Sequence, residues 1–314
     1  MAAKAWGSQQ KQVEEIFVQN DAVSLCMLIN RRARTVRVID FRAGPSNAKR
    51  LFVLSFAKRE NLHKIYTLVE RDEVATWIKL GFDKEGNIPA FYKRSDAFLL
   101  GCTVWSAAPP LEPDELPAQS ETRLVAAKPS TGAPMTAAQE RMERTIAAAK
   151  KSLKDAPPKA LQPAKVASVN EADARKAVAA ALRSGRAITA FEPFGRGVER
   201  RYFSVTVRGG FELYASTESQ ACFGNAYLEL LQGPRAEGER LCLTSALSAL
   251  CEALLADGVV SCFSLAPSDD VAVSMAFLQN GFRRTGLLAE HLLMGGQRRD
   301  AILWSRKLAN PSDD

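Results

Sequence analysis

The sequence contains few of the residues from which metal and redox sites are built. It has two histidines, His63 and His291, and six cysteines with no Cys-x-x-Cys pair. Zinc sites combine several such ligands at short spacing, so we expect no metal site. We interpret the cysteines as small buried apolar residues of a protein in a reducing compartment.

Long apolar runs are absent as well. The chain has no apolar stretch long enough to cross a bilayer, and none follows the opening residues Met1-Ala2-Ala3-Lys4. We therefore expect neither a membrane span nor a secretory signal, and no membrane partner. From these two absences we expect the protein to be cytoplasmic.

The motifs of the common hydrolases are missing too. The sequence has no G-x-x-x-x-G-K-[ST] phosphate loop and no G-x-S-x-G nucleophile turn. Its Gly195-Arg196-Gly197 stretch lacks the third glycine of a dinucleotide fingerprint and is more typical of a turn. These absences exclude the common nucleotide hydrolases and serine hydrolases.

The bulk composition is that of a globular, basic protein. Its 314 residues are 46% hydrophobic and 25% charged, with a net charge of +7, enough chain for two domains. Phosphate-bearing ligands or nucleic acid would suit this charge. The basic residues are interspersed with acidic ones and no nucleic-acid motif occurs, so we expect a solvated surface without nucleic-acid binding.

The most informative feature is a repeat. Leu80-Gly81-Phe82-Asp83-Lys84-Glu85-Gly86 is matched 200 positions later by Asn280-Gly281-Phe282-Arg283-Arg284-Thr285-Gly286. Each copy continues to an Asp-Ala pair, at Asp96 and Asp300, that opens an apolar run typical of a strand. Each Gly-Phe ends a helical pattern, where glycine can adopt a positive φ. One repeat of this length predicts two copies of one fold.

The elements around the repeat follow one order in both copies. In the second copy we predict strands over 202–208, 211–216, 226–231 and 259–265, a helix with leucines at 243, 247, 250 and 254, and a helix over 271–280 capped by Ser268-Asp269-Asp270. In the first copy we predict strands over 23–29, 35–41, 64–69, 88–92 and 97–104, with helices after Pro45-Ser46 and over 72–80.

This order resembles the GNAT superfamily of N-acetyltransferases over residues ~12–106 and ~185–309. The resemblance implies an α/β fold with a mixed sheet and two GNAT-like acyl-CoA N-acyltransferase domains, the first of them minimal. We predict domains at 12–106 and 168–309. The first copy's tail, from Glu85 to Tyr92 and on to Asp96-Ala97, also resembles bacterial β-lysine N-acetyltransferases over about 30 residues.

The segment between the copies has a different composition. Residues 107–167 hold nine of the fifteen prolines, with many alanines and lysines. We predict a flexible, disordered linker with a transient helix over Ala137–Asp155. A firmer helix is predicted from Glu171 to Leu182, with Asn170 as its cap.

The resemblance also implies a site for acetyl-CoA or another acyl-CoA. Family members hold the pyrophosphate with a loop of the form Gln/Arg-x-x-Gly-x-Gly/Ala before a helix, where backbone N–H groups are available. The second copy has Arg235-Ala236-Glu237-Gly238-Glu239-Arg240 there, which implies cofactor contacts from Arg235, Gly238 and Arg240. An exposed turn is the alternative. The first copy has Pro45 and Ala48 at the matching positions, so we expect it to lack the cofactor.

The catalytic groups are only partly present. Glu229, on the strand before the loop, is our candidate for the base that deprotonates an amine, although a solvent-facing structural carboxylate would explain it too. The family's tyrosine acid is replaced by Phe277 in the second copy and Trp77 in the first. Tyr227 or a water molecule could substitute. We expect acyl transfer to a primary amine by the second copy; the alternative is a catalytically degenerate binding or scaffolding module, a pseudoenzyme.

Overall fold

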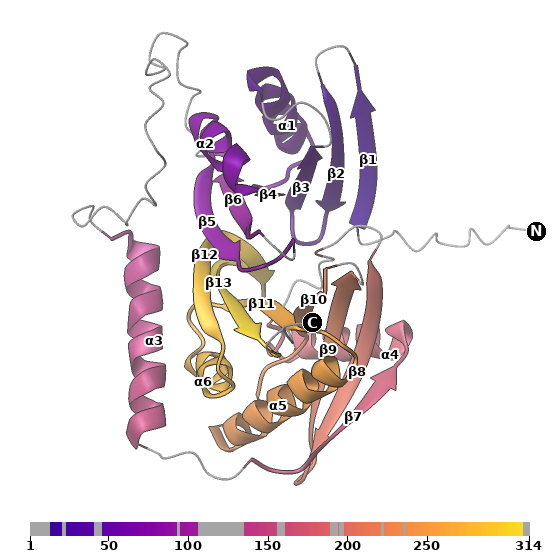
Figure 1. Cartoon of the computed structure of the whole chain (residues 1–314), viewed down its shortest axis with the longest axis vertical. Coiled ribbons are helices and arrows are strands. Elements are labelled where there is room, and N and C mark those ends of the chain that lie inside the picture. The colour runs from indigo at the N-terminus through magenta and orange to yellow at the C-terminus, as the bar shows by residue number, and fades with distance from the viewer. Residues whose placement is uncertain are drawn as a thin grey trace, which may run out of the picture.

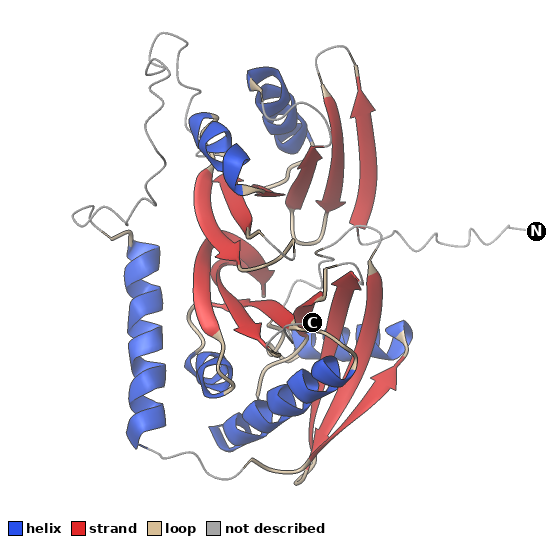
Figure 2. Cartoon of the chain, in the orientation of Figure 1, coloured by secondary structure: helices blue, strands red, loops and turns tan. Residues whose placement is uncertain are grey.

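One continuous sheet runs through the whole protein (Figures 1 and 2). The computed structural model describes residues 13–20, 23–40, 46–92, 95–105, 135–155, 161–188, 194, 198–220, 223–234 and 237–309. The sheet has 13 strands in the order β1-β2-β3-β4-β6-β5-β12-β13-β11-β10-β9-β8-β7. Parallel and antiparallel pairs both occur, so the predicted mixed α/β fold is confirmed.

We call β1–β6 with α1 and α2 the first half, and β7–β13 with α4–α6 the second half. The first half consists of β1 (Val13–Gln19), β2 (Ser24–Asn30), β3 (Thr35–Asp40), α1 (Asn47–Arg59), β4 (Lys64–Val69), α2 (Arg71–Lys79), β5 (Asp83–Ile88) and β6 (Ala97–Thr103). The second consists of β7 (Ala164–Val169), α4 (Glu171–Arg183), β8 (Glu199–Val207), β9 (Phe211–Gln220), β10 (Asn225–Leu230), α5 (Arg240–Ala256), β11 (Ser261–Pro267), α6 (Val271–Gln279), β12 (Arg283–Met294) and β13 (Gln297–Lys307).

The two halves are arranged symmetrically about the contact between β5 and β12. From the outer edge of each half toward the centre, an antiparallel hairpin comes first, followed by a strand that pairs in parallel with the next one. Two antiparallel strands then lead to the contact between β5 and β12. Gly86 and Gly286, the matching glycines of the repeat, are partners in this contact. A Cβ on Gly286 would lie 2.5 Å from the carbonyl oxygen of Glu85 and 2.6 Å from the Cα of Gly86. Both positions therefore need glycine for the halves to meet.

The repeated Gly-Phe ends a helix in the same way in both halves. Gly81 has φ 79° after α2, and Gly281 has φ 74° after α6. The phenylalanine that follows each glycine packs edge-on against an aromatic ring of the helix, Trp77 with Phe82 at 4.8 Å and Phe277 with Phe282 at 4.9 Å. The left-handed glycine turns the chain back so that this contact forms.

The repeated aspartate accepts a hydrogen bond from a nearby turn in both halves. Ala90 and Glu290 are matching residues with φ 53° and 50°, a backbone conformation that is costly outside glycine. A carboxylate oxygen of Asp96 accepts the N–H of Ala90 at 2.9 Å, and one of Asp300 accepts the N–H of Glu290 at 2.9 Å. The repeated Asp-Ala therefore holds a strained turn in each half.

Each half places one turn residue against the other. Phe91 of the first half packs on Phe263 of β11 with ring centroids 5.8 Å apart. The matching residue of the second half, His291, packs edge-on against Tyr66 of β4 at 5.0 Å. A hydrogen bond from Asn225 Nδ2 to the Phe91 carbonyl, 2.6 Å long, adds to the first contact. Because each half packs an aromatic turn residue against a strand of the other, the two halves share one buried interface.

The segment between the halves contains more structure than predicted. Ala137–Asp155 forms α3, a helix with Met142, Ile146 and Ala149 buried, and it packs against α6 (Figure 1). Arg141 bridges to Asp300 at 3.1 Å. The prediction of a flexible linker is therefore wrong for α3 and for β7, because contacts with α6 and β8 stabilise them. The rest of 107–167 lies largely outside the described residues, and the domain boundaries stay a prediction.

One strand was placed wrongly from the sequence. We expected residues 88–92 to form a strand, but β5 is the polar stretch Asp83–Ile88 and 89–92 form a turn. The predicted caps are confirmed at Asn170 and Asp270, which each accept a backbone N–H of the first turn of their helix. Ser46, after which a helix was predicted, caps α1 in the same way. Among the described helices, none is long and apolar enough to cross a membrane.

Candidate functional site

The candidate site lies where β10 and β11 separate. The two strands pair in parallel from Asn225 with Ser261 to Tyr227 with Phe263. β10 then continues to Leu230, paired on its other side with β9. A strand that leaves its neighbour exposes backbone groups along one edge, and an extended ligand can hydrogen-bond there.

The helix that follows this opening begins without a side-chain cap. α5 starts at Arg240, and its capping position, Glu239, makes no capping hydrogen bond through its side chain. Gly238, in the short 3₁₀ helix Glu237–Glu239, is exposed, and a Cβ there would meet no atom within 4 Å. A phosphate group binds at a helix N-terminus through backbone N–H groups and needs open space there.

The cofactor residues predicted from the sequence are only partly brought together. Gly238 and Arg240 lie at the start of α5, with Arg240 Nη1 3.4 Å from the sulfur of Met275 on α6. Arg235 lies outside the described residues, so its contact with a cofactor stays a prediction. The contact of Gly238 and Arg240 with a pyrophosphate group stays a prediction too.

Glu229 is completely buried and has a partner. Its carboxylate forms an ion pair with Arg200 of β8 and accepts the Ser216 hydroxyl at 2.8 Å. Arg200 also lies 3.3 Å from the Glu218 carboxylate. We call these four residues the carboxylate cluster. The alternative of a solvent-facing Glu229 is therefore wrong, because the side chain is 0% exposed. Its role as a base stays a prediction.

The charge state of the cluster follows from its contacts. Burial lowers the pKa of Arg200, but the carboxylates of Glu229 and Glu218 outweigh this effect and leave the pKa raised overall. Arg200 therefore stays charged. The Glu229 carboxylate, which already pairs with Arg200, is the group of this cluster that could accept hydrogen bonds from an ammonium group.

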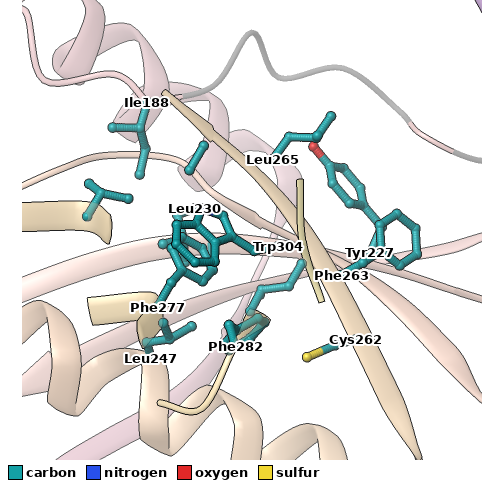
Figure 3. Packing of buried hydrophobic residues seen from close by; sticks show 14 of the residues in the cluster. Ile188, Tyr227, Leu230, Leu247, Cys262, Phe263, Leu265, Phe277, Phe282 and Trp304 are labelled. Atoms are coloured by element: carbon teal, nitrogen blue, oxygen red, sulfur yellow. The ribbon is translucent and has the colours of Figure 1, made fainter. Parts of the chain in front are cut away.

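Aromatic rings close this side of the site. Phe194 lies 5.0 Å from Tyr227 and 4.8 Å from Phe263, and Tyr227 lies 5.4 Å from Phe263, measured between centroids. Figure 3 shows Tyr227 and Phe263 next to each other. The Phe194 N–H donates to Glu218 Oε2 at 2.8 Å. Tyr227 is buried within this packing. Its side chain therefore has a structural role in the aromatic cluster, and its role as a proton donor stays a prediction.

Phe277, at the position of the family's tyrosine acid, is a core residue. Phe277 is fully buried and stacks on Trp304 with ring centroids 5.3 Å apart. Figure 3 shows the two side chains next to each other. A hydroxyl added at its para position would enter an apolar core, where an unpaired polar group is costly. Replacing Phe277 with tyrosine is therefore not expected to restore a proton donor.

Several site residues could not be found from the sequence. Arg200 pairs with Glu229 across two strands, and the only local signal was a buried carboxylate that needed a partner. Phe91 reaches the site from the first half, for which no sequence signal existed. No group of histidine, cysteine and acidic residues in the described ranges could hold a metal ion.

Comparison with known proteins gave structural matches alone. No family model matches the chain, and no curated protein matches it. Among solved structures, the ribosomal-protein-S18-alanine N-acetyltransferase of Escherichia coli matches at 17% identity over 48% of this chain and 98% of its own, with a TM-score of 0.37. A spermidine N-acetyltransferase of Vibrio cholerae, solved with CoA and spermine, matches at 10% identity over 46% of this chain and 95% of its own, with a TM-score of 0.37.

Proposed function

We propose that the second half binds an acyl-CoA and transfers the acyl group to a primary amine. The observation that carries this proposal is the separation of β10 from β11 after Tyr227 and Phe263, directly before the uncapped start of α5. Gly238 and Arg240 would hold the pyrophosphate, and the open edge of β10 would bind the acyl-bearing arm. The bound cofactor supplies an activated thioester.

The carboxylate cluster would receive the amine. An ammonium group is a cation and can take the place that Arg200 occupies beside Glu229, because both satisfy the same carboxylate. Glu229 would then accept the proton that the amine loses before attack. A general base of this kind contributes about 10²-fold to 10⁴-fold in rate.

The first half lacks these features. Ser46 caps α1 through its hydroxyl, which accepts the Lys49 N–H. The strand register places Ile39 where Glu229 lies in the second half and Arg37 where Tyr227 lies. We therefore assign one acyl-CoA site to the chain, and the first half supports it by covering the second.

A turnover assay with a panel of primary amines and acetyl-CoA tests the proposal. Glu229→Gln should lower kcat about 10²-fold while the affinity for acetyl-CoA is unchanged. Exposed Glu199→Gln is the matched control, since Glu199 lies at the start of β8 with its side chain 74% exposed. Equal activity of Glu229→Gln and the unmodified protein would contradict the role of Glu229.

The alternative is a binding module without catalysis. The ion pair between Glu229 and Arg200, and the buried phenylalanine at the acid position, both favour it. It predicts acetyl-CoA binding with no acylation of any amine in the panel.

A further inference from the structure

Arg37 is a buried cation with no counterion among the residues that the structure describes. Its side chain is on β3, only 9% exposed, and neither Nε nor Nη1 has a hydrogen-bond partner among the described residues. Its guanidinium lies over the ring of Phe194, 4.9 Å from the centroid. A buried charge without a partner costs several kcal/mol, and such a cost is usually repaid by a ligand or a counterion.

The surroundings of Arg37 leave it no acidic neighbour in the described residues close enough to form an ion pair. The group in contact with it is the Phe194 ring. Burial raises the pKa of Tyr92, and the charge of Arg37 offsets part of that rise. Arg32, from the turn before β3, is half-buried and adds a second positive charge close enough to influence Glu229. The interface between the halves is thus electropositive beside the carboxylate cluster.

Phe194 connects this positive site to the cluster. Its N–H donates to Glu218 Oε2 at 2.8 Å, and its ring contacts the Arg37 guanidinium. Arg37 and the carboxylate cluster thus contact the same residue from two sides. A small molecule with an ammonium group at one end and an oxyanion at the other could span both.

We propose that Arg37 binds an oxyanion, a carboxylate or a phosphate, carried by the acceptor amine. The planar guanidinium is suited to either group, because it can donate two parallel hydrogen bonds to a pair of oxygens. The substrate class is then an amino acid-like or phosphorylated amine. This inference rests on the proposed function for the amine end, whereas the oxyanion site can be tested without it.

The oxyanion site is tested by thermal unfolding with sodium phosphate and sodium acetate as probes, against sodium chloride at equal ionic strength. Either probe should raise the Tm of the unmodified protein above the chloride value. Arg37→Gln should abolish that rise, while exposed Arg208→Gln, in the turn after β8, should retain it. No rise beyond chloride, or an equal rise in Arg37→Gln, would overturn the proposal.

A second variant separates binding from a structural role. Arg37→Met removes a charge that has no partner, so the ligand-free variant should unfold about 2–4 °C higher than the unmodified protein. A lower Tm would mean that Arg37 stabilises the fold, and would overturn the assignment. In the amine panel, Arg37→Gln should reduce kcat/KM at least about 10-fold for amines that carry a carboxylate or phosphate and leave uncharged amines unchanged. If no amine reacts, the phosphate and acetate shifts still decide whether the oxyanion site exists.

Discussion

The two halves of the sheet share their connections and differ in the residues where their parallel strands meet. In the second half, Tyr227 and Glu229 lie on β10 beside a helix without a side-chain cap. In the first, the same positions are Arg37 and Ile39, and Ser46 caps the helix. Repeated residues that shape the backbone are the same in both halves. The residues that could bind or react, such as Glu229 and Arg37, differ between the matching positions of the two halves.

The comparison teaches which part of the repeat is structural. The Gly-Phe, the paired glycines at the centre and the aspartate that holds a strained turn each have a geometric reason in both halves. Resemblance carried by such residues therefore indicates the fold, and the chemistry has to be argued from Glu229, Gly238 and their neighbours.

The largest effect on stability is expected at a buried ion pair of the first half that has no counterpart at the matching positions of the second half. Lys64, 1% exposed, pairs with Glu85 and donates to the Ala289 carbonyl at 2.8 Å. The register places Ser261 and Thr285 at the matching positions. Lys64→Ser should lower the free energy of unfolding by about 3–5 kcal/mol, because Glu85 is left buried and unpaired. Chemical denaturation measures this loss.

The double variant tests the cause. Burial raises the pKa of Glu85 even with Lys64 beside it, so removing the carboxylate as well should recover much of the loss. Lys64→Ser with Glu85→Thr, which copies the second half, is expected to be more stable than Lys64→Ser alone. If the double variant were less stable than the single one, the charge argument would be wrong.

A smaller effect is expected where the halves join. Gly286→Ala would place a methyl carbon 2.6 Å from the Cα of Gly86, so β5 and β12 must move apart. We expect a loss of about 3 kcal/mol, the upper part of the usual range for overpacking. Gly238→Ala is the control, since a Cβ there meets no atom within 4 Å. Equal Tm values for the two variants would contradict the close contact.

The third prediction concerns pH. Burial, together with the charges of Lys64 and Arg298, lowers the pKa of His291 to about 3. The unfolded chain binds the proton near pH 6.5 and the folded chain does not, so stability is complete above that pH and falls as pH drops toward 3. The loss is about 1.4 kcal/mol per pH unit, or about 2 kcal/mol between pH 6.5 and 5.

His291→Phe copies Phe91, the matching residue of the first half, and should remove this slope. Denaturation at pH 8, where the histidine is neutral in both states, reports the packing difference by itself. A variant with the same pH dependence as the unmodified protein would show that His291 is not the group responsible.

Much of the fold follows from local residues, and the site does not. Helix caps at Asn170 and Asp270 were identified because a cap depends on residues three positions apart. β5 was missed because its polar residues are held by β6 and β12, which lie far along the chain. Glu229 was recognised as unusual, but its partner Arg200 is 29 residues away. Arg37 is seen to be a buried cation with no ion-pair partner among the described residues only once both halves are assembled.

Calorimetric titration with acetyl-CoA tests the difference between the halves most directly. The unmodified protein should bind one equivalent. Gly238→Pro, which removes a backbone N–H before α5, should lose binding, and Ala48→Pro, in the first turn of α1, should bind as the unmodified protein does. Equal loss in both variants, or binding that survives Gly238→Pro, would contradict a single acyl-CoA site in the second half.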